Sequence, residues 1–162
     1  MDFLNEMTLS FSSKSMNENF ARAAVSAFVL PLDPTINELA DIKTAVSEAV
    51  TNAIIHGYEY GDGIITVCAK ICPGGKVVIK VKDKGKGIED VKQALEPLFT
   101  TVGGERAGLG FAVMQSFMDS LKVKSRPGSG TVVTMEKFII RRSRTDSCTA
   151  PQKDEVIPND KA

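Results

Sequence analysis

The sequence predicts an α/β fold, specifically a two-layer sandwich in which helices cover one face of a mixed, mostly antiparallel sheet. Two helix-type segments come early in the chain, and strand-type segments mixed with further helices follow them. Two of the strands are joined by a turn short enough for an antiparallel hairpin. With 162 residues, the chain is long enough for one domain with a single core, and we expect that domain to span residues 1–140.

The first elements are a strand and a helix. Residues 6–13 alternate apolar and polar side chains, which predicts a short strand. Ser15 and Glu18 form the pattern of a capping box, so a helix should begin there. We expect one side of this helix to be apolar, through Phe20, Ala24, Val25 and Phe28.

A second capping box, formed by Thr35 and Glu38, predicts the start of a longer helix. Apolar side chains at helical spacing predict its buried stripe. The residues of this stripe are Leu39, Ile42, Val46, Ala49, Val50 and Ala53. Gly57 is expected to end the helix.

The second half of the chain begins with a predicted hairpin, whose strands are "GIITVCAKI" and "KVVIKVKD". A short helix is expected in "GKGIEDVKQALE", followed by a mobile loop in "PLFTTVGGERAG", which has no clear period. A helix from near Gly108 and two strands around the "PGSG" turn complete the ordered part. Residues 141–162 are polar and poor in large apolar side chains, which predicts a disordered tail.

Composition excludes several classes of protein. The 20 basic and 20 acidic residues balance, so no basic excess indicates direct contact with nucleic acid or a membrane surface. No apolar stretch approaches the ~18 residues of a membrane span, and the N-terminus lacks the pattern of a signal peptide. Three cysteines without a C-x-x-C pair, and a single histidine, argue against a zinc site. We therefore expect a cytoplasmic protein.

Three polar residues in the second helix require an explanation. Glu48, Asn52 and His56 are spaced four apart, so they form one row beside the apolar stripe. Polar groups at the edge of a core must find partners, because burying them without partners costs a few kcal/mol. For His56 alone, the preferred interpretation is a capping or packing group.

Glycine-containing stretches mark two candidate sites for a ligand. In "DKGKGI", Asp83 ends a strand, and Gly85 and Gly87 allow close approach of a ligand, although a surface turn explains this stretch equally simply. In "ERAGLGF", a helix N-terminus preceded by Arg106 suits phosphate, although close packing on a strand is the simpler alternative. "GSGTVV" is a hairpin turn in which Thr131 could also contact a ligand. None of these stretches matches the P-loop or the dinucleotide-binding fingerprint.

The order of these motifs resembles the ATP-binding (Bergerat-type) fold that DNA gyrase, the Hsp90 chaperone, histidine kinases and the mismatch-repair protein MutL share. It runs from E-x-x-x-N-x-x-x-H-G-Y through D-x-G-x-G and R-x-G-x-G to G-T-x-V, across residues 6–138. At finer grain, "LDPT", "DIKTAVSEAVTNAIIHGY", "PLFTT" and "ERAGLGF" are similar to the family of sporulation anti-sigma-F factors. Ala107 departs from the serine common in that family.

The resemblance implies a role for each motif residue. Asn52 would bind Mg²⁺, Glu48 would be the general base, Asp83 would accept the adenine amino group, and Arg106 would hold the phosphates during catalysis. The full set of residues implied to contact ATP or ADP is Asn52, Asp83, Gly85, Gly87, Thr100, Thr101, Arg106, Gly108, Leu109, Gly110 and Thr131.

The resemblance also implies the partners. The chain would bind and inhibit sporulation sigma-F and, as a protein-serine kinase, would phosphorylate and so inactivate an anti-anti-sigma antagonist. Arg22 would contact a partner, and the protein would form a homodimer through its first strand, with Met7, Leu9 and Phe11 as candidates. The alternatives are a switch kinase of the general stress response, a detached histidine-kinase-like ATPase domain and a non-catalytic nucleotide-binding module.

Overall fold

The computed structural model describes residues 3–96 and 109–140. The loop expected at 97–108 and the tail expected at 141–162 lie outside the described residues. The α helices are α1 (Met16–Val29), α2 (Ile36–Asn52), α3 (Val91–Ala94) and α4 (Gly110–Phe117). The strands are β1 (Asn5–Ser12), β2 (Ile64–Ile71), β3 (Lys76–Lys82), β4 (Ser120–Arg126) and β5 (Gly130–Phe138). Short 3₁₀ turns occur at Leu30–Leu32 and Pro73–Gly75, and a π-helical turn occurs at Ala53–Gly57.

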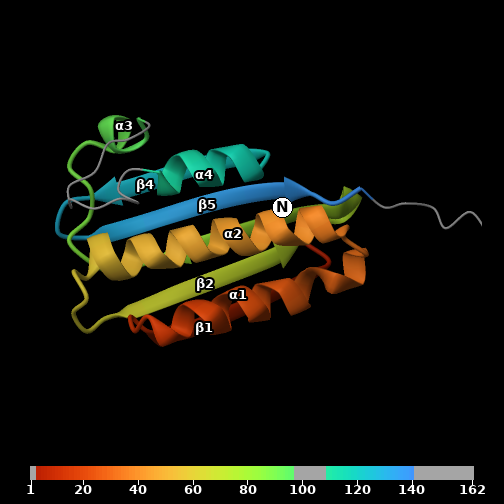
Figure 1. Ribbon diagram of the computed structural model, residues 1–162, viewed down its shortest axis with the longest axis horizontal. Helices are drawn as coiled ribbons and strands as arrows, with labels where there is room; N and C mark the ends of the chain where they lie inside the picture. The colour runs from red at the N-terminus through yellow and green to blue at the C-terminus, as the bar shows by residue number, and fades with distance from the viewer. Residues whose placement is uncertain (1–2, 97–108, 141–162) are drawn as a thin grey trace, which may run out of the picture.

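The predicted two-layer sandwich is confirmed. The five strands form one sheet in the order β1-β2-β3-β5-β4, and α1, α2 and α4 lie over one face of it (Figure 1). Every strand pairing among the described residues is antiparallel, so the sheet is more regular than the mixed sheet expected. No helix in the described part of the chain is both long and apolar enough to cross a membrane.

Helix α2 follows the sequence prediction closely. The capping box is present, since the Glu38 N–H donates to Thr35 Oγ1 (3.1 Å) and the Thr35 N–H donates to Glu38 Oε2 (2.7 Å). The predicted stripe is buried apart from the partly exposed Leu39. The α-helical part ends at Asn52, and the backbone continues to Gly57 as the π-helical turn, so the end of the helix is wider than predicted.

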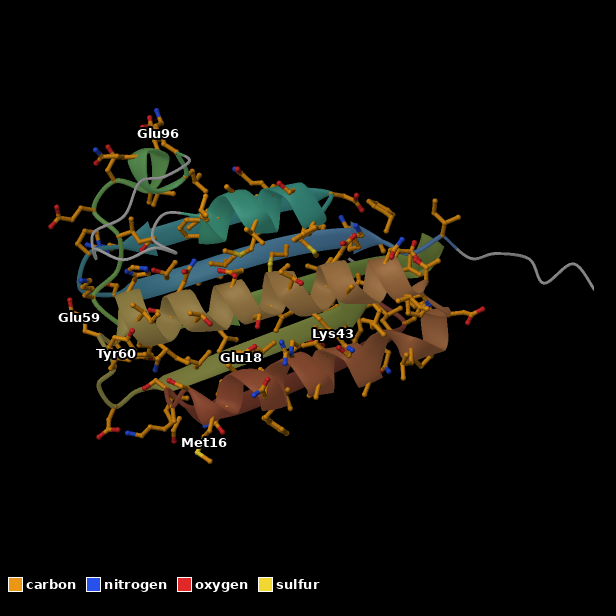
Figure 2. The ribbon with its side chains drawn as sticks, viewed as in Figure 1. Met16, Glu18, Lys43, Glu59, Tyr60 and Glu96 are labelled. Carbon is orange, nitrogen blue, oxygen red and sulfur yellow. The ribbon has the colours of Figure 1, made fainter. Side chains whose placement is uncertain are left out.

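Helix α1 differs from the prediction in its cap and in its buried side. Ser15 makes no side-chain cap hydrogen bond, and the Glu18 carboxylate instead accepts one from Ser47 Oγ of α2. The side chain of Glu18 lies between the two helices (Figure 2). Glu18 therefore bonds Ser47 on the neighbouring helix and not Ser15, the local partner that the sequence pattern predicts.

The buried stripe of α1 consists of Ala21, Val25 and Val29, so only Val25 was predicted correctly among the fully buried positions. Phe20 is 53% exposed, and its ring meets Phe11 of β1 edge-on with the centroids 6.2 Å apart. Small and β-branched side chains face the core because they let the helix lie close to its neighbours, whereas the phenyl ring fits only at the edge.

Met7, Leu9 and Phe11, the candidate contacts of a homodimer, are partly buried within the single chain, and their role in a dimer remains a prediction. Strand alternation turns all three toward the helices, where they pack against the core. The residues between them, among them Thr8 and Ser10, face the opposite side of the sheet.

Candidate nucleotide site

The Asp83 carboxylate lies at the end of β3 and is 9% exposed. Its Oδ1 accepts hydrogen bonds from the backbone N–H groups of Gly85 (2.9 Å) and Thr131 (3.2 Å). Burial raises the pKa of this carboxyl above its ordinary value, and the two N–H donors partly offset that effect. Oδ2 accepts no hydrogen bond from the described residues, so it can accept one from a ligand amino group.

Glycines allow the backbone to close around Asp83. A Cβ at Gly57 would lie 3.1 Å from Asp83 Oδ1, and a Cβ at Gly85 would lie 2.1 Å from the carbonyl oxygen of Gly57. Gly130 has a φ of +88°, and a Cβ there would lie 2.2 Å from the Asp83 carbonyl oxygen. Any side chain at Gly85 or Gly130 would collide with backbone, so the close backbone packing around Asp83 depends on glycine.

Gly87 has a second reason to be glycine. Its φ is +75°, and a Cβ there would lie 2.2 Å from the carbonyl oxygen of Arg126, at the turn between β4 and β5. The close approach is therefore made by this chain's own backbone. Whether Gly87 also contacts an adenine ring remains a prediction.

Glu48 and Asn52 of α2 meet the start of α4. A Cβ at Gly110 would lie 3.0 Å from both Asn52 Oδ1 and Asn52 Nδ2, and 3.2 Å from Glu48 Oε2. The absence of a side chain at Gly110 thus brings the N-terminus of α4 next to the polar row. A carboxylate, a carboxamide and a helix N-terminus converge there, a combination suited to a metal-bound phosphate.

The π-helical turn separates His56 from the row that the sequence predicts. A π-helical turn has more residues per turn than an α-helix, so the strict i, i+4, i+8 alignment ends at Asn52. His56 Nδ1 is buried and has no hydrogen-bond partner in the described part of the chain, so no capping role is observed. Burial and the nearby charge of Lys86 lower the pKa of His56, which keeps its ring neutral near pH 7.

Ser125 is a structural residue of the site that the sequence interpretation missed. Its Oγ accepts a hydrogen bond from the Ile88 N–H (2.8 Å), donates to the Gly130 carbonyl (3.0 Å) and lies 2.9 Å from Thr131 Oγ1. It therefore ties the glycine loop after Asp83 to the β4–β5 hairpin. The sequence feature that could have indicated this role is the position of Ser125 opposite Thr131 in the β4–β5 hairpin.

Tyr58 was also missed. Its hydroxyl donates to the Ile64 carbonyl (2.7 Å) and accepts from the Lys84 N–H (2.8 Å), while a Cβ at Gly63 would lie 2.2 Å from its ring. These contacts fix the end of α2 against β2 and the glycine loop. Glu59 and Tyr60 follow at this end of the molecule (Figure 2).

Not all of the predicted site residues are among those that the structure describes. Thr100, Thr101, Arg106 and Gly108 lie outside the described residues. Leu109 precedes α4 and is 41% exposed. Their contacts with nucleotide remain predictions.

The described residues contain no group of three or more His, Cys, Asp or Glu side chains that could hold a metal ion by themselves. Oxygen atoms of Asn52 and Glu48 nevertheless both lie close to Gly110 at the start of α4. Mg²⁺ commonly takes only one or two protein oxygens and completes its shell with water and phosphate, so these residues fit it.

Arg22 lies on α1 and is half-exposed. Its Nη2 donates to Asn19 Oδ1 (2.5 Å), and its Nη1 is 3.8 Å from Glu18 Oε1. Neither contact involves a residue predicted to bind nucleotide, which agrees with a position separate from the nucleotide site.

Comparison with known proteins identifies the family and the type of domain. Residues 14–137 match the family model described as "Histidine kinase-like ATPase domain". An anti-sigma F factor from Thermoanaerobacter pseudethanolicus is 62% identical over 86% of this chain and 97% of its own length. Another, from Caldanaerobacter subterraneus subsp. tengcongensis, is 61% identical over 87% of this chain and 99% of its own length.

The chain belongs to the anti-sigma F factor family. Solved structures agree with the fold of this family member. The RsbU and RsbW domains of a Mycobacterium tuberculosis protein match with a TM-score of 0.63 and 21% identity, over 86% of this chain and 33% of that one. A histidine kinase domain from Erythrobacter litoralis matches with a TM-score of 0.53 and 20% identity, over 75% of this chain and 61% of that one. The anti-sigma F family member therefore carries an ATP-binding, kinase-like domain.

Proposed function

We propose that this chain is an ATP-dependent protein-serine kinase that also acts as an anti-sigma factor for a sigma-F-like sigma factor. Its kinase substrate would be an anti-anti-sigma antagonist, which phosphorylation on serine inactivates. The convergence of Glu48, Asn52 and Gly110 is the observation that supports catalysis most directly. A module that uses nucleotide only for its shape needs no carboxylate beside the metal site.

In the proposed mechanism, each described residue has one task. Asp83 accepts a hydrogen bond from the adenine amino group through Oδ2, and Thr131 and Ser125 keep the carboxylate and the glycine loop in place. Asn52 would hold Mg²⁺ through its side-chain oxygen. When bound, ATP would supply the phosphoryl group and Mg²⁺ would neutralise part of the charge of the phosphates.

The serine oxygen is proposed to form a bond to the γ-phosphorus of ATP while the bond from that phosphorus to the leaving ADP breaks, and Glu48 is proposed to take the proton of the serine hydroxyl on its carboxylate. The backbone N–H groups at the start of α4, with Arg106 and Gly108 upstream, are proposed to bind the phosphate oxygens. Phosphoryl transfer of this type depends chiefly on positioning and electrostatics, which suits a site assembled from fixed helix ends.

The decisive experiment mixes the purified chain with labelled ATP, Mg²⁺ and the candidate antagonist, with and without sigma-F. We expect acid-stable label on an antagonist serine, and ATP-dependent capture of sigma-F. Acid-labile label on His56, the single histidine of the chain, would instead support a histidine-kinase-like activity. No label on any protein, with normal ATP binding, would support a non-catalytic module.

We also propose a homodimer, built along the outer edge of β1, because β1 ends the sheet and its outer edge has no strand partner among the described residues.

A further inference from the structure

The face of the sheet opposite the helices carries a group of four lysines, which we call the lysine patch. Helices α1, α2 and α4 all lie on the other face (Figure 1), so none of these three helices covers these side chains. The lysine patch consists of Lys80 and Lys82 on β3 and Lys122 and Lys124 on β4.

Strand register places these lysines in two neighbouring rows. Lys80 and Lys122 both pair with Thr134 of β5, and Lys82 and Lys124 both pair with Val132. Lysines in the same row are therefore two strands apart, about 10 Å between Cα atoms, and those on the same strand are about 7 Å apart.

No carboxylate among the described residues forms an ion pair with the lysine patch. The other two lysines on this face differ, since Lys70 pairs with Glu6 (3.0 Å) and Lys76 pairs with Glu136 (2.8 Å). Among the described residues, Lys70 and Lys76 are thus paired with carboxylates, whereas the four lysines of the patch are not. This division is notable in a chain whose total charge is zero.

The rest of these two rows contains no acidic side chain, although the second row includes the apolar Val132. Thr8 and Cys68 continue the first row, and Ser10 and Thr66 continue the second, with Thr66 Oγ1 3.2 Å from Ser10 Oγ. The rows therefore offer ammonium and hydroxyl donors and contain no aromatic ring. Single-stranded nucleic acid is bound largely by stacking of successive bases on aromatic side chains. Phe3, which lines a hollow on this face with Cys68 and Lys80, already has the Lys70 ammonium 4.4 Å from its ring centroid, so it does not provide a series of free rings for such a ligand.

We infer that the lysine patch is a docking surface for an acidic polypeptide segment in an extended conformation. Alternate side chains of an extended segment lie on one side with about 7 Å between them, which matches the separation of Lys80 from Lys82 and of Lys122 from Lys124. The surface lies on the face opposite the helices that carry Glu48, Asn52 and Arg22. Docking there is therefore an interaction beyond the proposed kinase and sigma-binding activities.

The test measures binding of a fluorescent peptide in which glutamate alternates with threonine. We expect saturable binding at low salt that weakens as salt is added, because exposed charges are screened. Replacing two patch residues, K82Q with K124Q, should weaken binding by about fivefold, the loss expected for two exposed ion pairs. The matched control, K70Q with K76Q, removes the same number of charges from the same face and should change affinity less than the patch variant.

Three further ligands and a second pair of variants complete the experiment. A peptide of the same composition with its glutamates contiguous should bind more weakly, since its carboxylates do not match the spacing of the lysines. Equal losses in the patch and control variants, or equal affinity for the two peptides, would overturn the proposal in favour of unspecific attraction. Tighter binding of a single-stranded oligonucleotide of equal length, or of anionic vesicles, would overturn it in favour of that other class of ligand. A second pair, K80Q with K122Q, repeats the test if the first pair perturbs folding, as judged by circular dichroism.

Discussion

Replacing Gly110 by alanine tests whether the start of α4 and the polar row of α2 form one catalytic site. The new Cβ would lie 3.0 Å from Asn52 Oδ1 and 3.2 Å from Glu48 Oε2, closer than ordinary van der Waals contact. Both neighbours are ends of side chains, so each must move by a few tenths of an ångström. Folding should survive, because the φ of Gly110 lies outside the left-handed region and the atoms that must move are side-chain ends.

The expected loss is in the chemical step. A misplacement of about 1 Å can cost on the order of 10²-fold in rate, so a shift of a few tenths should lower kcat by about tenfold. Single-turnover transfer of labelled phosphate to the antagonist measures the rate, and thermal unfolding monitors the fold. Ser116→Ala is the matched control, since Ser116 lies on α4, is exposed and bonds only the Ala112 carbonyl (3.0 Å). If Gly110→Ala transfers phosphate at the parent rate, the proposal that Glu48 and Asn52 form the catalytic site beside the start of α4 is refuted.

Four further predictions address the other assignments. Glu48→Gln should keep ATP and sigma-F binding but slow phosphorylation of the antagonist by ~10²–10⁴-fold. The lower end of that range is expected because the transition state of phosphoryl transfer is loose. An unchanged rate in the same single-turnover assay would exclude Glu48 as the base. Asp83→Asn should weaken ATP binding by more than about tenfold in calorimetry, or about 1.4 kcal/mol. Burial raises the pKa of Asp83, and the adenine amino group donates to its ionised carboxylate. ATP affinity should therefore fall as the pH is lowered through that raised pKa. The contribution of Asp83 to this fall should be absent in Asp83→Asn. Arg22→Ala should weaken capture of sigma-F or the antagonist with ATP affinity unchanged; equal loss of both would contradict its placement apart from the nucleotide site. Light scattering should give a dimer at micromolar concentration, and a monomer with and without nucleotide would contradict pairing along β1.

The sequence alone determined the features that depend on neighbours along the chain. The capping box of Thr35 and Glu38 joins residues three apart, and the stripe of α2 follows from helical spacing, so both were read correctly. The β2–β3 hairpin was equally predictable, because its two strands alternate and are joined by a short turn. The motif order also predicted the fold of the family, although the roles of its residues remain predictions.

Only the tertiary structure decided the contacts between distant segments. Glu18 bonds Ser47 on α2 although its sequence pattern indicates a bond to Ser15, since a partner across the helix pair outcompeted the local one. The π-helical turn removed His56 from its predicted row, and the role of Ser125 depends on the pairing of β4 with β5. The meeting of Gly110 with Glu48 and Asn52 is likewise set by helix packing. Local patterns cannot specify such contacts, because they depend on how whole elements dock and on which side chains are small enough to let them approach.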